Sequence, residues 1–196
     1  MTGLDVDEQW LDVARKASVG SGLRIDWRCG NASSLPFPSD SFDVVLCQQG
    51  LQFFDDRKSA VHEMCRVLAR DGRLGASVFR SIDRSPGYSS LARALGRHVG
   101  PKAEAFTQKI FSLGDPDVLR SLMQSEGFRH IEVRPTVRNV HFRSVEDFPH
   151  VYALGWEAPP AITKAVIDDV ARDLRKFEGA HGVTFPMEAL LATATK

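Results

Sequence analysis

The chain has 196 residues, and its 25 basic and 25 acidic side chains give a formal net charge of zero. Apolar residues make up 43% and charged residues 26%, which is typical of a globular domain that buries its own core. A neutral chain gives no electrostatic reason to expect a nucleic-acid partner. No apolar run approaches the roughly 20 residues that span a bilayer. The N-terminal sequence also lacks the basic and apolar regions of a signal peptide. We therefore expect one cytoplasmic domain over residues 1–196.

The three cysteines, Cys29, Cys47 and Cys65, show no CxxC or Cys/His spacing that would hold a metal ion. An odd set of cysteines suits a reducing compartment. Cys47 and Cys65 lie in apolar segments, where we expect them to act as small core residues. The sequence contains no HExxH, GxSxG or Walker motif. It therefore predicts no metal site.

Residues 1–28 read as a strand, a helix and a second strand. We expect Met1 to Val6 to be the tail of a buried strand that ends in Asp5, followed by a helix capped by Asp7. Leu23 to Arg28 alternates apolar and polar residues, as a half-exposed edge strand does. The expected inward side of the helix consists of Trp10, Leu11, Val13, Ala14 and Ala17.

The next segment repeats the order of strand and helix. The run FDVVLC from Phe42 to Cys47 is short, β-branched and apolar, as in a parallel strand covered on both faces. Asp55 or Asp56 is expected to cap a helix that ends in a left-handed stop at Asp71-Gly72. Leu74 to Phe79 is the next expected strand. This alternation predicts an α/β fold with a parallel, doubly wound sheet.

Residues 80–112 interrupt the alternation and carry a helical insert. Asp115-Pro116 then starts a helix, 128–140 is strand material, and an amphipathic helix covers about 160–177. The closing sequence VTFPMEALLATA can supply a last strand. We expect residues 80–112 and 144–180 to cover the carboxyl ends of the strands, where ligands bind in open α/β sheets.

Three segments carry a resemblance: TGLDVDEQWLDVAR, LPFPSDSFD and RVLARDGRLGAS. They resemble class I S-adenosylmethionine-dependent methyltransferases, in the quinone-biosynthesis-like branch known as methyltransferase type 11. The resemblance is strong from Thr2 to about Gly87 and moderate from Phe111 to Val133. It implies a Rossmann-like sheet, S-adenosylmethionine as cofactor, and methyl transfer to a small molecule. Arg70 and Asp71 replace the family's usual proline and first glycine at the helix stop.

The resemblance implies a cofactor site of six residues: Asp5, Val6, Asn31, Ala32, Cys47 and Gln48. Asp5 would accept the ribose hydroxyls, with Val6 beside the adenine ring, or Asp5 merely caps the following helix. Asn31, with Ala32 after it, stands where the family has an aspartate that accepts the adenine amino group, and it is equally a turn residue. The backbone of Cys47 and Gln48 would contact the methionine part of the cofactor. The next residues, 51–54, either line the mouth of the site or belong to the core.

No catalytic residue is predicted, because methyl transfer from a sulfonium needs proximity and orientation more than acid–base groups. His98, His141 and His150 lie in the expected cover and are candidate bases, or ordinary surface residues. The cover is rich in aromatic residues, which suggests an apolar methyl acceptor, although aromatic residues also build cores. They are Phe106, Phe111, Phe142, Phe148, Tyr152 and Trp156.

The family begins with a strand and a GxGxG loop that hold the cofactor, and this sequence has neither. In the family's sheet that strand lies between the strands that end here at Asp5 and Cys47. We therefore expect a gap between two strand edges, with weak or absent cofactor binding. Each unmet buried backbone group costs about 1–3 kcal/mol. We also expect about 40–70 further in-frame residues upstream of Met1, from ordinary element lengths.

Two functions remain open at this point. The leading interpretation is a small-molecule methyltransferase. The alternative is a non-catalytic remnant or interaction module of the same fold, which the missing glycine loop favours. A different nucleotide-binding protein is disfavoured, because nothing in the sequence resembles a phosphate cradle. The oligomeric state is not predicted.

Overall fold

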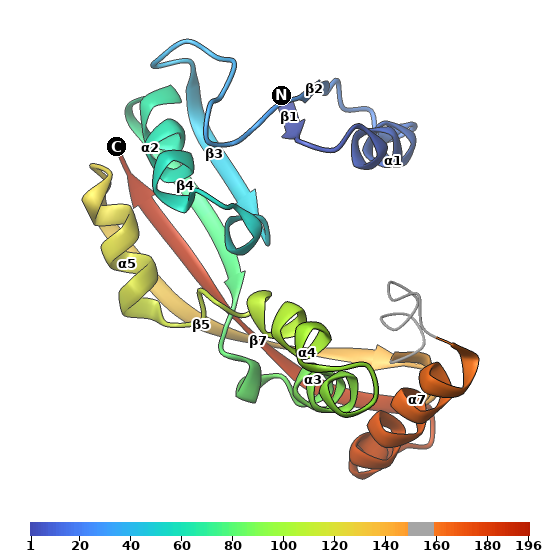
Figure 1. The fold of residues 1–196 in the computed structure, drawn as a ribbon. Helices are drawn as coiled ribbons and strands as arrows, with labels where there is room; N and C mark the ends of the chain where they lie inside the picture. Colours follow the sequence, from blue (N-terminus) through green and yellow to red (C-terminus); the bar gives the residue numbers. More distant parts are fainter. Residues whose placement is uncertain (149–158) are drawn as a thin grey trace. The chain divides into compact units, whose positions relative to one another are not determined.

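The structure is a computed structural model that describes residues 1–148 and 159–196 (Figure 1). The chain divides into two compact units. The first unit consists of Met1–Ala76, Arg120–Glu132 and Ala192–Lys196, and the second of Ser77–Leu119 and Val133–Leu191. None of the helices in the described ranges is long and apolar enough to cross a bilayer.

The first unit begins with β1 (Thr2–Asp5), α1 (Glu8–Ser18) and β2 (Asp26–Cys29). The two strands pair in parallel from Thr2↔Asp26 to Asp5↔Cys29 and form a separate two-stranded sheet. Asp7 caps α1 as expected, because its Oδ1 accepts the Gln9 backbone N–H at 2.8 Å. The order of strand, helix and strand is therefore confirmed.

The buried side of α1 differs from the expectation. Leu11 is buried, but Trp10 is 65% exposed and Val13 is exposed as well. The two-stranded sheet of β1 and β2 is narrow and gives α1 little surface to cover. The predicted five-residue inward side was therefore wrong for Trp10, Val13 and Ala17, which are exposed, and right for Leu11.

The larger sheet has the strand order β3-β4-β7-β5, with β6 paired antiparallel to β7. The predicted antiparallel pairing near the C-terminus is thus confirmed. The strands are β3 (Phe42–Gln48), β4 (Leu68–Phe79), β5 (Arg129–Phe142), β6 (Glu178–Gly179) and β7 (Gly182–Thr195).

β3 is a strand as predicted, but it lies at the end of this order and is not covered on both faces. Val44 is 54% exposed and Leu46 is 78% exposed. The apolar run correctly predicted a strand. It did not predict that, among the described residues, β3 has a neighbouring strand on one side only.

The helix after β3 is α2 (Arg57–Val67), and Asp56 caps it by accepting the Ser59 N–H at 2.9 Å. The helix buries Ala60, Val61, Met64 and Val67. The predicted stop is displaced, because the helix ends at Val67 and β4 begins at Leu68. Asp71 has the expected left-handed backbone, with φ of 62°, but within the extended segment. α5 (Pro116–Ser125) starts after Asp115, whose Oδ1 accepts the Asp117 N–H at 2.8 Å.

The second unit contains α3 (Pro86–His98), α4 (Pro101–Lys109) and α7 (Pro160–Leu174). Two short 3-10 helices complete it, η2 (Ile82–Arg84) and η3 (Arg175–Phe177). Pro86 opens α3, since proline is tolerated in the first helical turn. The predicted helical character of 80–112 and of 160–177 is confirmed.

The core of the second unit is aromatic. Tyr88 packs edge-on against Phe111 and Phe148, with ring centroids 5.2 and 5.5 Å apart, and Phe148 packs against Phe185 at 5.2 Å. Phe111 and Phe148 are buried in this core, and Phe106 is 58% exposed. The aromatic residues expected to line an acceptor pocket are therefore core or surface. Tyr152 and Trp156 lie outside the described residues.

Candidate functional site

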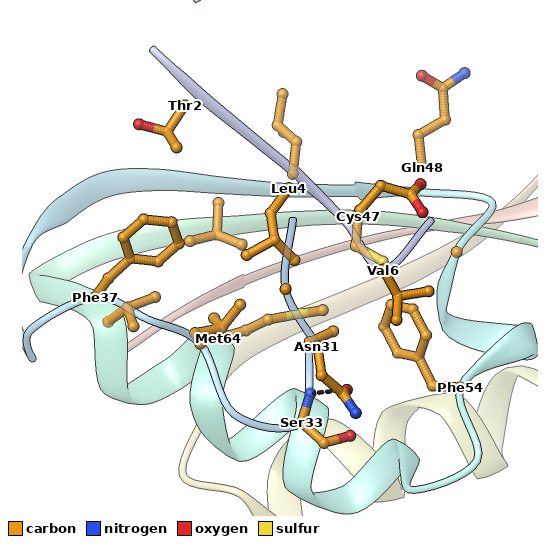
Figure 2. Close-up of a pocket in the computed structure, with 18 of the residues that line it drawn as sticks. Thr2, Leu4, Val6, Asn31, Ser33, Phe37, Cys47, Gln48, Phe54 and Met64 are labelled. Atoms are coloured by element: carbon orange, nitrogen blue, oxygen red, sulfur yellow. Dashed lines mark hydrogen bonds between the residues drawn. The ribbon is translucent and has the colours of Figure 1, made fainter. Parts of the chain in front are cut away.

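One cavity of about 570 Å³ lies in the first unit and is lined by residues of β1, β3 and the loops that follow β2 and β3 (Figure 2). The cavity is lined by all six of the residues expected at a cofactor site. They are Asp5, Val6, Asn31, Ala32, Cys47 and Gln48. Three pairs of residues that lie apart in the sequence therefore meet at one cavity.

Asp5 ends β1 and is half-buried at the cavity. Its Oδ1 accepts the backbone N–H of Asp7 at 2.9 Å, so the carboxylate does act at the start of α1. A carboxylate has about four acceptor sites on two oxygens. Asp5 can therefore make this local bond and still accept hydroxyl groups. Val6, next to it, is largely exposed at the cavity.

Asn31 is exposed, and its Oδ1 accepts the backbone N–H of Ser33 at 2.9 Å (Figure 2). This bond makes Asn31 a turn residue, which was one of the two interpretations. An amide oxygen has two lone pairs. One of them remains for an amino group, so the turn does not prevent the second role. Ala32 completes this part of the lining.

A partly buried ion pair on α2 holds the loop after Asn31 in place. Arg66 donates to both Glu63 carboxylate oxygens, at 2.6 and 2.8 Å, and to the carbonyls of Leu35 and Phe37 at 3.1 and 2.9 Å. Glu63 in turn accepts the Leu35 N–H at 2.7 Å. The Arg66 hydrogen bonds lower the pKa of Glu63.

Sequence reasoning missed this pair. Its only signal was the i, i+3 spacing of opposite charges on a predicted helix, which marks a local pair and says nothing of a loop. The hydrogen bonds to Leu35 and Phe37 show that Glu63 and Arg66 shape the wall of the cavity.

Cys47 is buried at the carboxyl end of β3. Burial raises the pKa of its thiol, while backbone hydrogen bonds from Gly50 and Leu51 act in the opposite direction. A protonated thiol is a poor nucleophile. Through its hydrogen bonds with the backbone of Gly50 and Leu51, the side chain of Cys47 helps to shape the loop after β3. Gln48, next to it, is exposed and lines the cavity.

The open question about residues 51–54 is answered residue by residue. Leu51 and Gln52, in the 3-10 helix η1 (Leu51–Phe53), are buried core residues. Phe53 and Phe54 line the cavity. The Gln52 Nε2 donates to Gln49 Oε1 at 3.0 Å, and Gln49 has a left-handed backbone with φ of 52°. The loop after β3 is thus built around buried side chains, with two phenylalanines left on the cavity.

The charged groups on the cavity are all acidic. Asp5, Asp55 and Asp56 line it, and no Lys or Arg belongs to the described lining. The hydrogen bond from Ser59 lowers the pKa of Asp56. The cavity therefore favours neutral or cationic ligands over anions.

The candidate bases lie in the second unit. His98 Nε2 is 2.9 Å from Asp169 Oδ2, and His141 Nδ1 is 3.1 Å from Thr184 Oγ1. Each is thus engaged by a neighbour in its own unit. His150 lies outside the described residues. Within the ranges that the structure describes, no group of His, Cys, Asp or Glu side chains could hold a metal ion.

Residues 1–76 match the family model described as a methyltransferase domain. The demethylmenaquinone methyltransferase of Deinococcus radiodurans is 32% identical over 140 residues, which are 66% of this chain and 58% of that protein. An uncharacterized methyltransferase of Bacillus subtilis, YcgJ, is 39% identical over 72 residues, which are 36% of this chain and 28% of that protein. The chain thus spans less than two thirds of the length of these relatives.

Solved structures show the same fold. A methyltransferase structure from Bacillus halodurans, described as putative, aligns with 100% of this chain and 82% of its own, with a TM-score of 0.67 and 19% identity. The YcgJ structure aligns with 100% of this chain and 81% of its own, with a TM-score of 0.66 and 21% identity. The predicted Rossmann-like α/β fold is confirmed by these likenesses.

Proposed function

We propose, from the premise that this chain belongs to the class I S-adenosylmethionine-dependent methyltransferases, that its first unit binds this cofactor and serves methyl transfer to a small molecule. The observation that supports the proposal is the meeting of Asp5, Asn31 and Cys47 on one cavity. A volume of about 570 Å³ also falls in the usual range for small-molecule sites, about 300–1,000 Å³.

The lining suits the proposed cofactor in its charge and in its acceptors. Asp5 would accept ribose hydroxyls, and Asn31 Oδ1 would accept the adenine amino group with its second lone pair. The acidic lining favours the positive charge of a sulfonium. When bound, the cofactor would supply an activated methyl group, and the residues here would hold and orient it.

We propose that the chain binds the cofactor weakly, because it has no GxGxG sequence to supply a tight loop of backbone N–H groups. The chain provides side-chain acceptors for the adenosine half. For the amino-acid half it offers the loop after β3.

The proposed methyl acceptor is a small and largely apolar molecule. The support comes from the similarity to a demethylmenaquinone methyltransferase and from Phe53 and Phe54 on the cavity. The aromatic residues of the second unit no longer support it, because those described are core or surface. A role for residues 80–112 and 144–180 as cover, and a cytoplasmic location, remain parts of this proposal.

Titration calorimetry with S-adenosylhomocysteine tests the site. Asp5→Asn keeps an oxygen for the Asp7 N–H but removes the charge, so we expect about 1–3 kcal/mol weaker binding from lost charge-assisted hydrogen bonds. Asp12→Asn, on exposed α1 and off the cavity, is the matched control. Equal affinity of the two variants would reduce Asp5 to a helix-start residue. Tight binding by the unaltered chain would contradict weak binding while keeping the site.

The alternative is an interaction module without catalysis. One observation favours it: β3 has an exposed apolar edge at the cavity. A folded chain that binds neither S-adenosylmethionine nor S-adenosylhomocysteine and shows no methyl transfer would favour this alternative.

A further inference from the structure

The loop after β3 begins with a residue in an unusual backbone conformation. Gln49 has a φ of 52°, in the left-handed region that residues other than glycine rarely adopt. This conformation is strained for an L-amino acid, and it persists only where neighbouring groups hold it. Gln49 comes directly after the last residue of β3, so its conformation sets the direction in which the chain leaves the strand. The loop therefore needs a group that holds Gln49.

The side chain of Gln52 supplies that group. Gln52 is fully buried, and its Nε2 donates to the Oε1 of Gln49 at 3.0 Å. Its backbone carbonyl accepts a hydrogen bond from Arg57 Nη2 at 2.9 Å, which ties Gln52 to the first residue of α2. Gln52 therefore connects the left-handed residue to the helix that follows the loop.

One half of the buried Gln52 amide is not used for hydrogen bonding. Its Oε1 has no hydrogen-bond partner among the residues that the structure describes. A buried acceptor without a donor is unfavourable, and an apolar side chain of the same shape would avoid this cost. Core packing therefore gives no reason for an amide at this position. The bond to Gln49 does give one.

The turn at Gln49 brings the rest of the loop against the cavity. Gly50, Phe53 and Phe54 line the cavity, and the ring of Phe54 is seen there below Cys47 (Figure 2). A Cβ atom added to Gly50 would lie 3.3 Å from the Sγ of Cys47, so the turn packs closely on this thiol. A change at Gln49 would therefore move several parts of the cavity wall together.

We propose that Gln52 is a positioning residue of the candidate cofactor site: its buried amide holds Gln49 in the left-handed conformation and so keeps the loop after β3 against the cavity. Gln52 is not part of the described lining, so it acts through the loop and not by touching a ligand. This inference rests on the proposed function, in which the loop serves the amino-acid half of the cofactor. Loss of the amide should therefore weaken cofactor binding and leave the fold intact.

Cysteine alkylation of the full chain measures the state of the loop without any ligand. Cys47 is buried beside the loop, Cys65 is buried in α2, and Cys29 is exposed. A buried thiol reacts slowly until a local opening exposes it. Labelling with iodoacetamide, followed for each cysteine by peptide mass spectrometry, thus reports loop opening at Cys47 and unfolding of the surrounding unit at Cys65. The labelling of Cys29 reports the activity of the reagent.

Gln52→Met removes the amide and keeps an unbranched side chain of similar length. We expect about tenfold faster alkylation of Cys47, with the other two cysteines unchanged, and about fivefold weaker binding of S-adenosylhomocysteine in calorimetry. Gln108→Met is the matched control, because it removes an exposed amide that donates to Glu104 on α4. The control should change neither measurement.

Substitutions of Gln49 test whether Gln52 acts through this residue. Glycine adopts a positive φ without strain, so Gln49→Gly added to Gln52→Met should return both measurements to within about twofold of the unaltered chain. Gln49→Ala keeps the strain and loses the bond to Gln52, so by itself it should behave as Gln52→Met does.

Each outcome decides the inference. Faster alkylation of Cys47 with weaker binding, both reversed by Gln49→Gly, supports it. Unchanged alkylation of Cys47, unchanged affinity, or no reversal by glycine overturns it. Equal acceleration at Cys65 also overturns it, because Gln52 would then only stabilise the fold. If the unaltered chain binds no S-adenosylhomocysteine, the proposed function fails, whereas the alkylation of Cys47 still decides whether Gln52 holds the loop.

Discussion

The two units bury apolar surface to different extents. The second unit closes its aromatic residues into a core in which Phe148 is fully buried. The first unit leaves Val44 and Leu46 exposed beside a cavity. The segments compared in the two units are both apolar, and both have residues that favour regular secondary structure. Composition therefore does not explain the contrast. The contrast follows from packing, because Phe148 lies against the rings of Tyr88, Phe142 and Phe185, whereas β3 has a strand neighbour on one side only among the described residues.

The largest expected effect is in the closed core. Phe148→Ala should lower the free energy of unfolding by about 3–5 kcal/mol, because it removes a ring packed against Tyr88, Phe142 and Phe185. Leu46→Ala in the open unit should change it by less than about 0.5 kcal/mol. Denaturant unfolding measures both. A large loss for Leu46→Ala would show that the first unit is closed in solution.

The loop beside the cavity should respond next. Arg66→Ala leaves the partly buried Glu63 without its cation and frees the carbonyls of Leu35 and Phe37, so we expect a loss of about 1–3 kcal/mol. Arg15→Ala, which breaks an exposed pair on α1, should cost at most about 1 kcal/mol. Chemical unfolding measures both variants. Equal losses of unfolding free energy in Arg66→Ala and Arg15→Ala would mean that the loop is not held by Arg66.

Asp169 links α7 to α3 in the second unit, and it predicts a pH dependence. Hydrogen bonds from His98 first, then the neighbouring Arg172 and Arg97, lower the pKa of Asp169 to about 2 from 3.8. A lowered folded-state pKa stabilises the fold above the unfolded value, and this stability is lost as the pH falls from about 4 to 2. In Asp169→Asn, the melting temperature should change less with pH in this interval than in the unaltered chain. An equal change of melting temperature with pH in both proteins would show that Asp169 is not the source of the pH dependence.

The smallest expected effect is at the start of α1. Asp7→Ala removes the acceptor of the Gln9 N–H and should cost about 1 kcal/mol. Asp7→Ser keeps an acceptor and should recover most of the loss. Thermal unfolding followed by far-ultraviolet circular dichroism compares the two variants. If serine does not restore stability, the loss comes from another contact of Asp7.

The family resemblance implied a cofactor site at Asp5, Asn31 and Cys47, and these three residues line one cavity. That they bind the cofactor stays a prediction. The sequence could not decide whether Leu51 to Phe54 face the core or the cavity, since a short 3-10 helix has no extended periodicity. It also missed Glu63 and Arg66 as loop-holding residues, because their partners lie about thirty residues earlier.

By itself, the sequence predicted the order of the strands and helices and the caps at the starts of three helices. These depend on hydrogen bonds and apolar spacing within a few residues, as at Asp7, Asp56 and Asp115. Only the tertiary structure decided which apolar residues are buried. FDVVLC reads as a covered strand and Phe106 as a pocket residue, yet Leu46 and Phe106 are exposed. Burial depends on the neighbouring element that covers a face, and that neighbour is set by the arrangement of distant segments rather than by the residues of the strand.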